Sequence, residues 1–144
     1  MIEFSTILYL TDFSESSEYA CQYAISIAGK YGCRICVAHV IEPFTYADDF
    51  GIDYAAQFRE MEATARRLLD KTVASMKSTG ADVEGVILSG NPSAEIVKFA
   101  EEETIDLIVM ATHGRSGVEH LLMGSVAEKV LRKSPCPVMT VKKK

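Results

Sequence analysis

The stretch DLIVMATHGRSGVEHLLMGSV, residues 106–126, decides the fold class of this chain. It begins with an almost entirely apolar run, residues 106–111, and continues through a loop, residues 112–123. A helical pattern then starts at Gly124. A strand without polar alternation is typical of a parallel sheet that is covered on both faces. The stretch therefore predicts a strand-loop-helix unit of an α/β protein.

The same alternation of strands and helices continues along the whole chain. Apolar runs predict further strands at 4–10, 34–41, 83–88 and 138–141, and helical spacing predicts helices at 15–31, 54–78, from 92 onward and 124–133. Strict alternation implies an open five-stranded parallel sheet with right-handed connections and helices on both faces. A length of 144 residues fits a single domain, 1–144. Ligands of such sheets bind beyond the carboxyl ends of the strands.

Two helices carry regular side-chain patterns. In the first, Tyr19, Tyr23, Ile27 and Tyr31 recur at a spacing of four, with Ala20, Ala24 and Ala28 beside them. In the second, one side is expected to carry Phe58, Met61, Ala65, Leu68, Leu69, Val73 and Met76. These patterns predict amphipathic helices that cover the sheet.

Composition and charge exclude several classes of protein. The formal charge of −5 makes nucleic acid an unexpected partner, because an acidic chain repels phosphate backbones. The run Lys142-Lys143-Lys144 is interpreted as a solvated tail. No apolar run approaches the roughly 20 residues of a membrane span. The first residues lack the pattern of a signal peptide, so we expect a cytoplasmic protein that does not act at a membrane.

Four cysteines are present, and two of them form a C-x-x-C pair, Cys33 and Cys36. A redox pair of this kind usually lies at the start of a helix, whereas this one leads into a strand. Residues three apart on a strand point to opposite faces. A zinc site would need a second pair of ligands. We therefore expect reduced cysteines and no metal site.

The loop that begins at Thr112 carries the chemistry. Gly124 and Ser125 open a helix, whose free N–H groups and partial positive charge attract phosphate. Gly114 and Gly117 allow the incoming loop to bend back over the same point. Arg115 is able to reach a phosphate or a partner chain. Each glycine alone fits an ordinary turn or helix cap as well, but together they predict a phosphate site.

Asp12 lies in the turn after the first strand, at the same edge of the sheet. A carboxylate in this place accepts hydrogen bonds from ribose hydroxyls in other nucleotide-binding folds. His113 lies inside the loop, where it either contacts a phosphate or bonds a neighbouring carbonyl group and holds the shape of the loop. His39 is interpreted as a core residue whose hydrogen bonds are satisfied.

Over nearly its whole length the sequence resembles the universal stress proteins. The resemblance rests on the segments 7–14, 39–40, 90–92, 106–117, 122–130 and 135–138. It implies the strand order 3-2-1-4-5, with the reversal of order between strands one and four. Many members bind ATP through G-x-x-G-x9-G-[ST], and here Gly114, Gly124 and Ser125 occupy the second glycine, the third glycine and the hydroxyl position.

The resemblance also implies roles for other residues. Asp12, which follows Thr11, corresponds to the acid at the ribose. Val40 and Met110 correspond to walls of the adenine pocket. Val126 and Arg115 correspond to phosphate contacts. Any Mg²⁺ is expected to be carried by the phosphates. Two positions depart from the pattern. Ala111 replaces the first glycine, and Leu10 replaces a common proline but is still able to form a pocket wall.

Three functions follow as expectations. The first is an adenine-nucleotide-binding stress or regulatory protein, which acts as a homodimer through the strand Val138–Val141 and binds a regulatory protein partner. The second is a slow ATPase or self-phosphorylating protein that uses Ser125 or Thr112, for which no general base is evident. The third is a nucleotide-free interaction module, which Ala111 favours.

Overall fold

The computed structural model describes residues 1–43, 53–114 and 123–144. Its strands are β1 (Thr6–Leu10), β2 (Arg34–Ile41), β3 (Val83–Ser89), β4 (Leu107–Ala111) and β5 (Val138–Val141). Its helices are α1 (Glu15–Tyr31), α2 (Tyr54–Lys77), α3 (Pro92–Glu102) and α4 (Ser125–Lys133). Every predicted element is present, and the observed ends differ from the predicted ones by at most two residues.

The five strands form one parallel sheet in the order β3-β2-β1-β4-β5. This confirms the predicted α/β class and the strand order that the resemblance implied. β1 lies at the centre, paired with β2 on one side and β4 on the other. The order of the strands reverses between β1 and β4, so a crevice is expected at their carboxyl ends.

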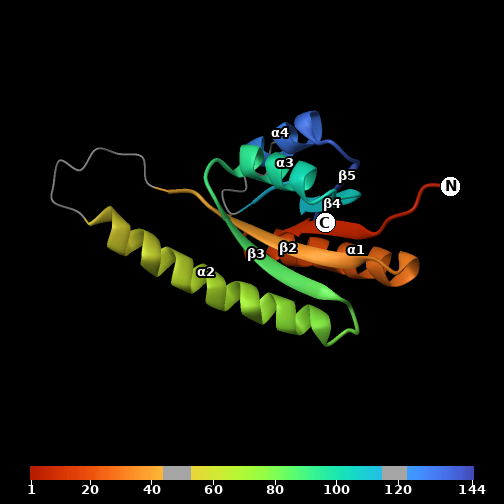
Figure 1. Ribbon diagram of the computed structural model, residues 1–144, viewed down its shortest axis with the longest axis horizontal. Helices are drawn as coiled ribbons and strands as arrows, with labels where there is room; N and C mark the ends of the chain where they lie inside the picture. Colours follow the sequence, from red (N-terminus) through yellow and green to blue (C-terminus); the bar gives the residue numbers. More distant parts are fainter. Residues whose placement is uncertain (44–52, 115–122) are drawn as a thin grey trace.

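The helices cover both faces of the sheet, as predicted (Figure 1). One buried cluster joins the sheet to α1 and α2 through Ala20, Ala24, Leu69 and Met76. The other joins the opposite face to α3 and α4 and includes Ile96, Ala100, Ala127 and Val130. Along β1 the side chains alternate between the two clusters, as they must in a strand with both faces buried.

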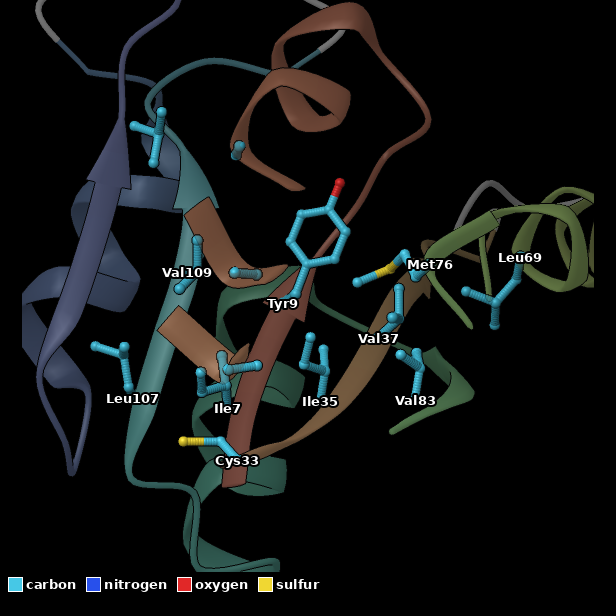
Figure 2. Close-up of a cluster of buried hydrophobic side chains, with 14 residues drawn as sticks. Ile7, Tyr9, Cys33, Ile35, Val37, Leu69, Met76, Val83, Leu107 and Val109 are labelled. Atoms are coloured by element: carbon cyan, nitrogen blue, oxygen red, sulfur yellow. The ribbon is translucent and has the colours of Figure 1, made fainter. Parts of the chain in front are cut away.

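The buried face of α1 is made of alanines and not of tyrosines. Ala20 and Ala24 are fully buried, whereas 42% of Tyr23 and 55% of Tyr31 is exposed. Small side chains let the helix backbone approach the sheet closely. The space that remains is filled from the sheet side by Ile7, Tyr9, Val37 and Val109 (Figure 2). The Tyr9 hydroxyl donates to the backbone carbonyl of Ser17 in the first turn of α1.

The predicted apolar side of α2 is only partly buried. Ala65, Leu69 and Met76 pack into the core, but Met61 is 38% exposed and Phe58 is half-buried. No residue of α2 before Ala65 is fully buried. The first turns of the helix therefore extend beyond its main contact with the sheet (Figure 1).

Helix ends follow the capping rules. Ser14 accepts from the backbone N–H of Ser17 and begins α1, and Gly32, with φ of 70°, ends it. Asn91 accepts from the N–H of Ala94 and begins α3, with Pro92 in the first turn, as predicted.

Strand β1 starts at Thr6, two residues later than the sequence predicts. Its start is fixed by Asp106, whose Oδ2 accepts from the backbone N–H groups of Ser5 at 2.8 Å and Thr6 at 2.9 Å. Asp106 precedes β4 in the chain, so this carboxylate joins the starts of two neighbouring central strands.

The cysteines are free, and the C-x-x-C pair is divided by the sheet. Cys33 belongs to the cluster under α1 and α2, and Cys36 to the cluster under α3 and α4. Burial raises the pKa of both thiols, that of Cys36 to about 11. These positions explain why the pair forms no disulfide.

No helix within the described ranges combines the length and the apolar composition that a membrane crossing requires.

Candidate functional site

A cavity of about 370 Å³ lies at the carboxyl ends of β1, β2 and β4, where the strand order reverses. Its lining includes the predicted residues Leu10, Thr11, Asp12, Val40, Met110, Ala111, His113, Gly114, Gly124, Ser125 and Val126. Arg115 and Gly117 lie outside the described residues. The structure thus brings together every predicted site residue that it describes.

One end of the cavity is apolar. Leu10, Val40, Met110 and Val126 all belong to the cluster between the sheet and the helices α3 and α4. They come from three strands and one helix, and they form a wall suited to a flat, weakly polar ring. Ile96 of α3 adds to the same wall.

Asp12 is held at the cavity by the turn between β1 and α1. Its Oδ1 accepts from the backbone N–H of Ser14 at 3.0 Å, and Thr11 Oγ1 accepts from the N–H of Phe13 at 3.0 Å. Phe13 has a φ of 65°, a left-handed conformation that is uncommon for a residue with a side chain. Its ring packs on His39, with 4.5 Å between the ring centroids. The carboxylate is thereby given a defined position.

Gly114 brings the loop after β4 against this carboxylate. A Cβ atom at position 114 would lie 2.5 Å from Asp12 Oδ2, closer than real Cβ contacts allow. A side chain at position 114 would therefore force the Asp12 carboxylate or the loop to move. The structure gives Gly114 no positive φ that would itself demand glycine.

The start of α4 offers backbone donors. The N-cap residue is Gly124, which has no side chain with which to cap the helix. The Gly124 N–H donates to the Thr112 carbonyl at 2.7 Å, and a Cβ atom on Gly124 would lie 3.2 Å from that oxygen. The next amides, including those of Ser125 and Val126, belong to the first turn and have no acceptor within the helix. This end of the cavity is suited to an anion.

Ala111 does not obstruct the cavity. It is the last residue of β4 and its φ is not positive, so alanine is unstrained at the position of the first glycine. Its side chain packs against the cluster under α1 and α2, on the face of the sheet opposite to Met110. The methyl group therefore points away from the apolar wall.

The two described histidines differ in their hydrogen bonds. His39 Nδ1 lies 2.8 Å from the Thr11 carbonyl oxygen, so the ring is hydrogen-bonded as predicted, but His39 is half-buried and borders the cavity instead of lying in the core. His113 Nδ1 lies 3.1 Å from Thr112 Oγ1, but its buried Nε2 has no hydrogen-bond partner among the described residues. In the same part of the chain, no group of three His, Cys, Asp or Glu side chains is arranged to hold a metal ion.

Sequence reasoning missed some lining residues. Ala38, Ser17, Pro92, Ile96 and Ala127 also border the cavity. Pro92 had a signal, because it starts the helix after β3, and helix starts in this fold meet the carboxyl edge of the sheet. The others are small or apolar residues whose sequence pattern indicates only burial.

The comparison with known proteins matches this architecture. A family model, described as the universal stress protein family, matches residues 3–142. The chain belongs to the universal stress protein family. Universal stress protein MJ0577 of Methanocaldococcus jannaschii is 31% identical over 158 residues, an alignment that covers 99% of this chain and 98% of that protein. In the superposition with its solved structure the identity is 30%, the TM-score is 0.88, and 99% of each chain is covered.

Two further solved universal stress proteins hold nucleotides. One, in complex with cAMP, is 26% identical with a TM-score of 0.75, and 99% of this chain and 100% of that chain are covered. The other, from Archaeoglobus fulgidus in complex with dAMP, is 25% identical with a TM-score of 0.72 and the same coverage.

Proposed function

We propose that this universal stress protein binds an adenine nucleotide, ATP, in the cavity between β1 and β4. The observation that carries the proposal is the arrangement of three groups around one cavity: an apolar wall, the Asp12 carboxylate and the start of α4 at the N-cap residue Gly124. These groups correspond to the base, the ribose and the phosphates of a nucleotide, in that order. Adenine nucleotides in two related structures support the same ligand class.

The residues of the site divide by role. Leu10, Val40 and Met110 would enclose the adenine ring, Asp12 would accept from ribose hydroxyls, and Val126 would contact the phosphates. The amides after Gly124 and the Ser125 hydroxyl would donate to phosphate oxygens. Arg115 and Gly117 are proposed to complete the phosphate side, and any Mg²⁺ would be carried by the phosphates.

We further propose that the chain is a single-domain cytoplasmic regulator. Two copies would pair through the outer edge of β5, and the occupied site would change contacts with a regulatory partner. The orientation of Ala111 argues against a nucleotide-free interaction module. The presence of Ala111 in place of glycine favoured that alternative, but its methyl group points away from the apolar wall and leaves the cavity open.

The test is nucleotide release and rebinding. Protein purified without added nucleotide is denatured, and the supernatant is analysed by ion-exchange chromatography. The refolded or emptied protein is then titrated with ATP, AMP and cAMP. The Gly124→Asp variant places a carboxylate among the helix-start amides and is expected to lose the nucleotide.

Gly29→Ala is the matched control, since a Cβ atom at position 29 has open space around it. About one adenine nucleotide per chain in the wild type and in Gly29→Ala, but not in Gly124→Asp, is the expected result. A folded wild-type protein that neither carries nor binds any of the three nucleotides would refute the proposal.

A further inference from the structure

The side chain of Ser17, in the first turn of α1, lies next to the turn that carries Asp12. Ser17 is 3% exposed, and its Oγ lies 3.2 Å from Oγ1 of Thr11, the residue before Asp12. The backbone groups of Ser17 are engaged as well, since its N–H donates to Ser14 Oγ at 3.2 Å and its carbonyl accepts from the Tyr9 hydroxyl. Ser17 is therefore held in place both from the helix cap and from the core.

The hydrogen bonds of Ser17 fix the direction of its bond to Thr11. A serine hydroxyl has one proton, and that of Ser17 donates to the Ser14 carbonyl oxygen at 2.9 Å. In the contact between the two hydroxyls, the Thr11 hydroxyl is therefore the donor. Because its proton is directed to Ser17, Thr11 Oγ1 presents its lone pairs to the backbone N–H of Phe13, which donates to it at 3.0 Å.

Phe13 is the residue that needs this support. Its φ of 65° is left-handed, and such strain in a residue with a side chain persists only where the surrounding structure holds it. The contact of its ring with His39 and the hydrogen bond to Thr11 Oγ1 both restrain it. Asp12 lies between Thr11 and Phe13, so the position of its carboxylate depends on the same turn.

We propose that Ser17 is a positioning residue for the ribose of the nucleotide. It orients the Thr11 hydroxyl, which restrains the backbone at Phe13 and thereby holds the Asp12 carboxylate at the cavity. Ser17 also borders the cavity, but its proton is used by the Ser14 carbonyl, so it acts through Thr11 and not as a donor to the ligand. This inference rests on the proposed function, in which Asp12 accepts from the ribose hydroxyls.

The role makes a specific distinction between ligands. A nucleotide with ribose hydroxyls depends on the position of the Asp12 carboxylate, whereas 2′,3′-dideoxy-ATP has no hydroxyl to donate to it. The two ligands share the base and the phosphates. A loss that is confined to ATP therefore separates a positioning role from a general loss of structure in the cavity.

Titration calorimetry on the full chain, emptied of nucleotide, tests the proposal with ATP and 2′,3′-dideoxy-ATP as probes. We expect Ser17→Ala to weaken ATP binding about fivefold or more and binding of the dideoxy analogue less than about twofold. Ser16→Ala is the matched control, since it removes a neighbouring serine hydroxyl of α1 that takes no part in the bonds to Thr11 and Ser14. It is expected to bind both probes as the wild type does.

Two further measurements test whether Ser17 acts through the turn. In an Asp12→Ala background, Ser17→Ala is expected to change ATP affinity less than about twofold, because the group that it positions is absent. Thr11→Val removes the hydroxyl between Ser17 and Phe13 and is expected to reproduce the loss for ATP but not for the analogue. Thr11→Ser keeps the hydroxyl and is expected to match the wild type. The Thr11 pair tests the same connection should Ser17→Ala not fold.

Unchanged ATP affinity in Ser17→Ala, or equal losses for ATP and the dideoxy analogue, would overturn the proposal and leave Ser17 a structural residue of α1. Wild-type protein that binds the two probes equally well would overturn it too, because the ribose hydroxyls would then have no partner to position. Either result leaves nucleotide binding itself intact. Wild-type protein that binds neither probe contradicts the proposed function.

Discussion

Gly114 lies so close to Asp12 that a Cβ atom added to the glycine would be 2.5 Å from the carboxylate oxygen Oδ2. This contact joins the loop after β4 to the turn after β1, two segments that are far apart in the sequence. Glycine is favoured at position 114 because of this short distance to Asp12 and not because of its backbone φ angle.

Gly114→Ala is expected to push the Asp12 carboxylate or the loop out of place. Nucleotide affinity should fall about tenfold or more, since the loss of a hydrogen bond to a charged group contributes about 1.5–3 kcal/mol. Titration with ATP and adenosine measures the effect, and both ligands should lose affinity because Asp12 is placed at the ribose. Normal binding by Gly114→Ala, in a preparation where Gly29→Ala is also normal, would show that the site tolerates the methyl group.

Ala111→Gly restores the glycine that the resemblance leads one to expect, yet it should not improve the site. The methyl group packs under α1 and α2, on the face opposite to the adenine wall. We expect nucleotide affinity within about twofold of wild type and a loss of about 1 kcal/mol in the free energy of unfolding, because glycine is flexible in a strand and the methyl contact is lost. Urea denaturation and calorimetry give the two values, and a large gain in affinity would contradict this assignment.

Thr140→Pro tests the proposed pairing of two copies through β5. The carbonyl oxygens of Pro137 and Val141 accept hydrogen bonds from backbone N–H groups at β4. Because the N–H and C=O groups of successive residues point to alternate sides of a strand, those of Val138 and Thr140 point outward, away from β4. Proline at position 140 removes an outward N–H while the ladder to β4 stays intact, and proline is tolerated on edge strands. Light scattering at micromolar concentration should show a dimer for wild type and Thr140→Val and a monomer for Thr140→Pro. A wild-type monomer, or a dimer in all three proteins, would argue against this interface.

The buried thiol of Cys36 gives a pH dependence to stability. Burial raises its pKa from the ordinary value of 9.0 to about 11, so the unfolded chain loses this proton at a lower pH than the folded protein does. The contribution of the neutral thiol to the free energy of unfolding is complete below pH 9 and is lost as the pH rises to about 11. The loss is at most about 3 kcal/mol, since a shift of one pKa unit corresponds to about 1.36 kcal/mol. The free energy of unfolding should therefore fall more steeply across this window in the wild type than in Cys36→Ala. Parallel profiles for the two proteins would contradict the cause assigned to the shift.

The fold could be predicted from local pattern because strands and helices alternate so regularly in this chain. The unbroken apolar run at β4 indicated a central strand, and Asn91-Pro92 marked the start of α3. The location of the site followed from topology, since a reversal of strand order determines where a crevice opens.

Other features depend on distant contacts and left no local signal. The tyrosines of α1 form the more visible pattern, but the alanines face the sheet because only small side chains allow close approach. The start of β1 depends on Asp106, about a hundred positions later in the chain. The effect of Ala111 was ambiguous in the sequence, because it depends on the backbone φ angle at this position and on the face of the sheet to which the methyl group points.

Gly114 and Asp12 belong to parts of the cavity that are synthesised at different times. The cavity takes one part of its lining from β1 and another from α4, which follows β1 in the chain after three further strands and three helices. A nascent chain therefore exposes the carboxylate side of the cavity long before the amide side exists. A ligand held by both sides can bind and stabilise only a chain that extends through α4, so occupancy would distinguish such chains from those that stop before this helix.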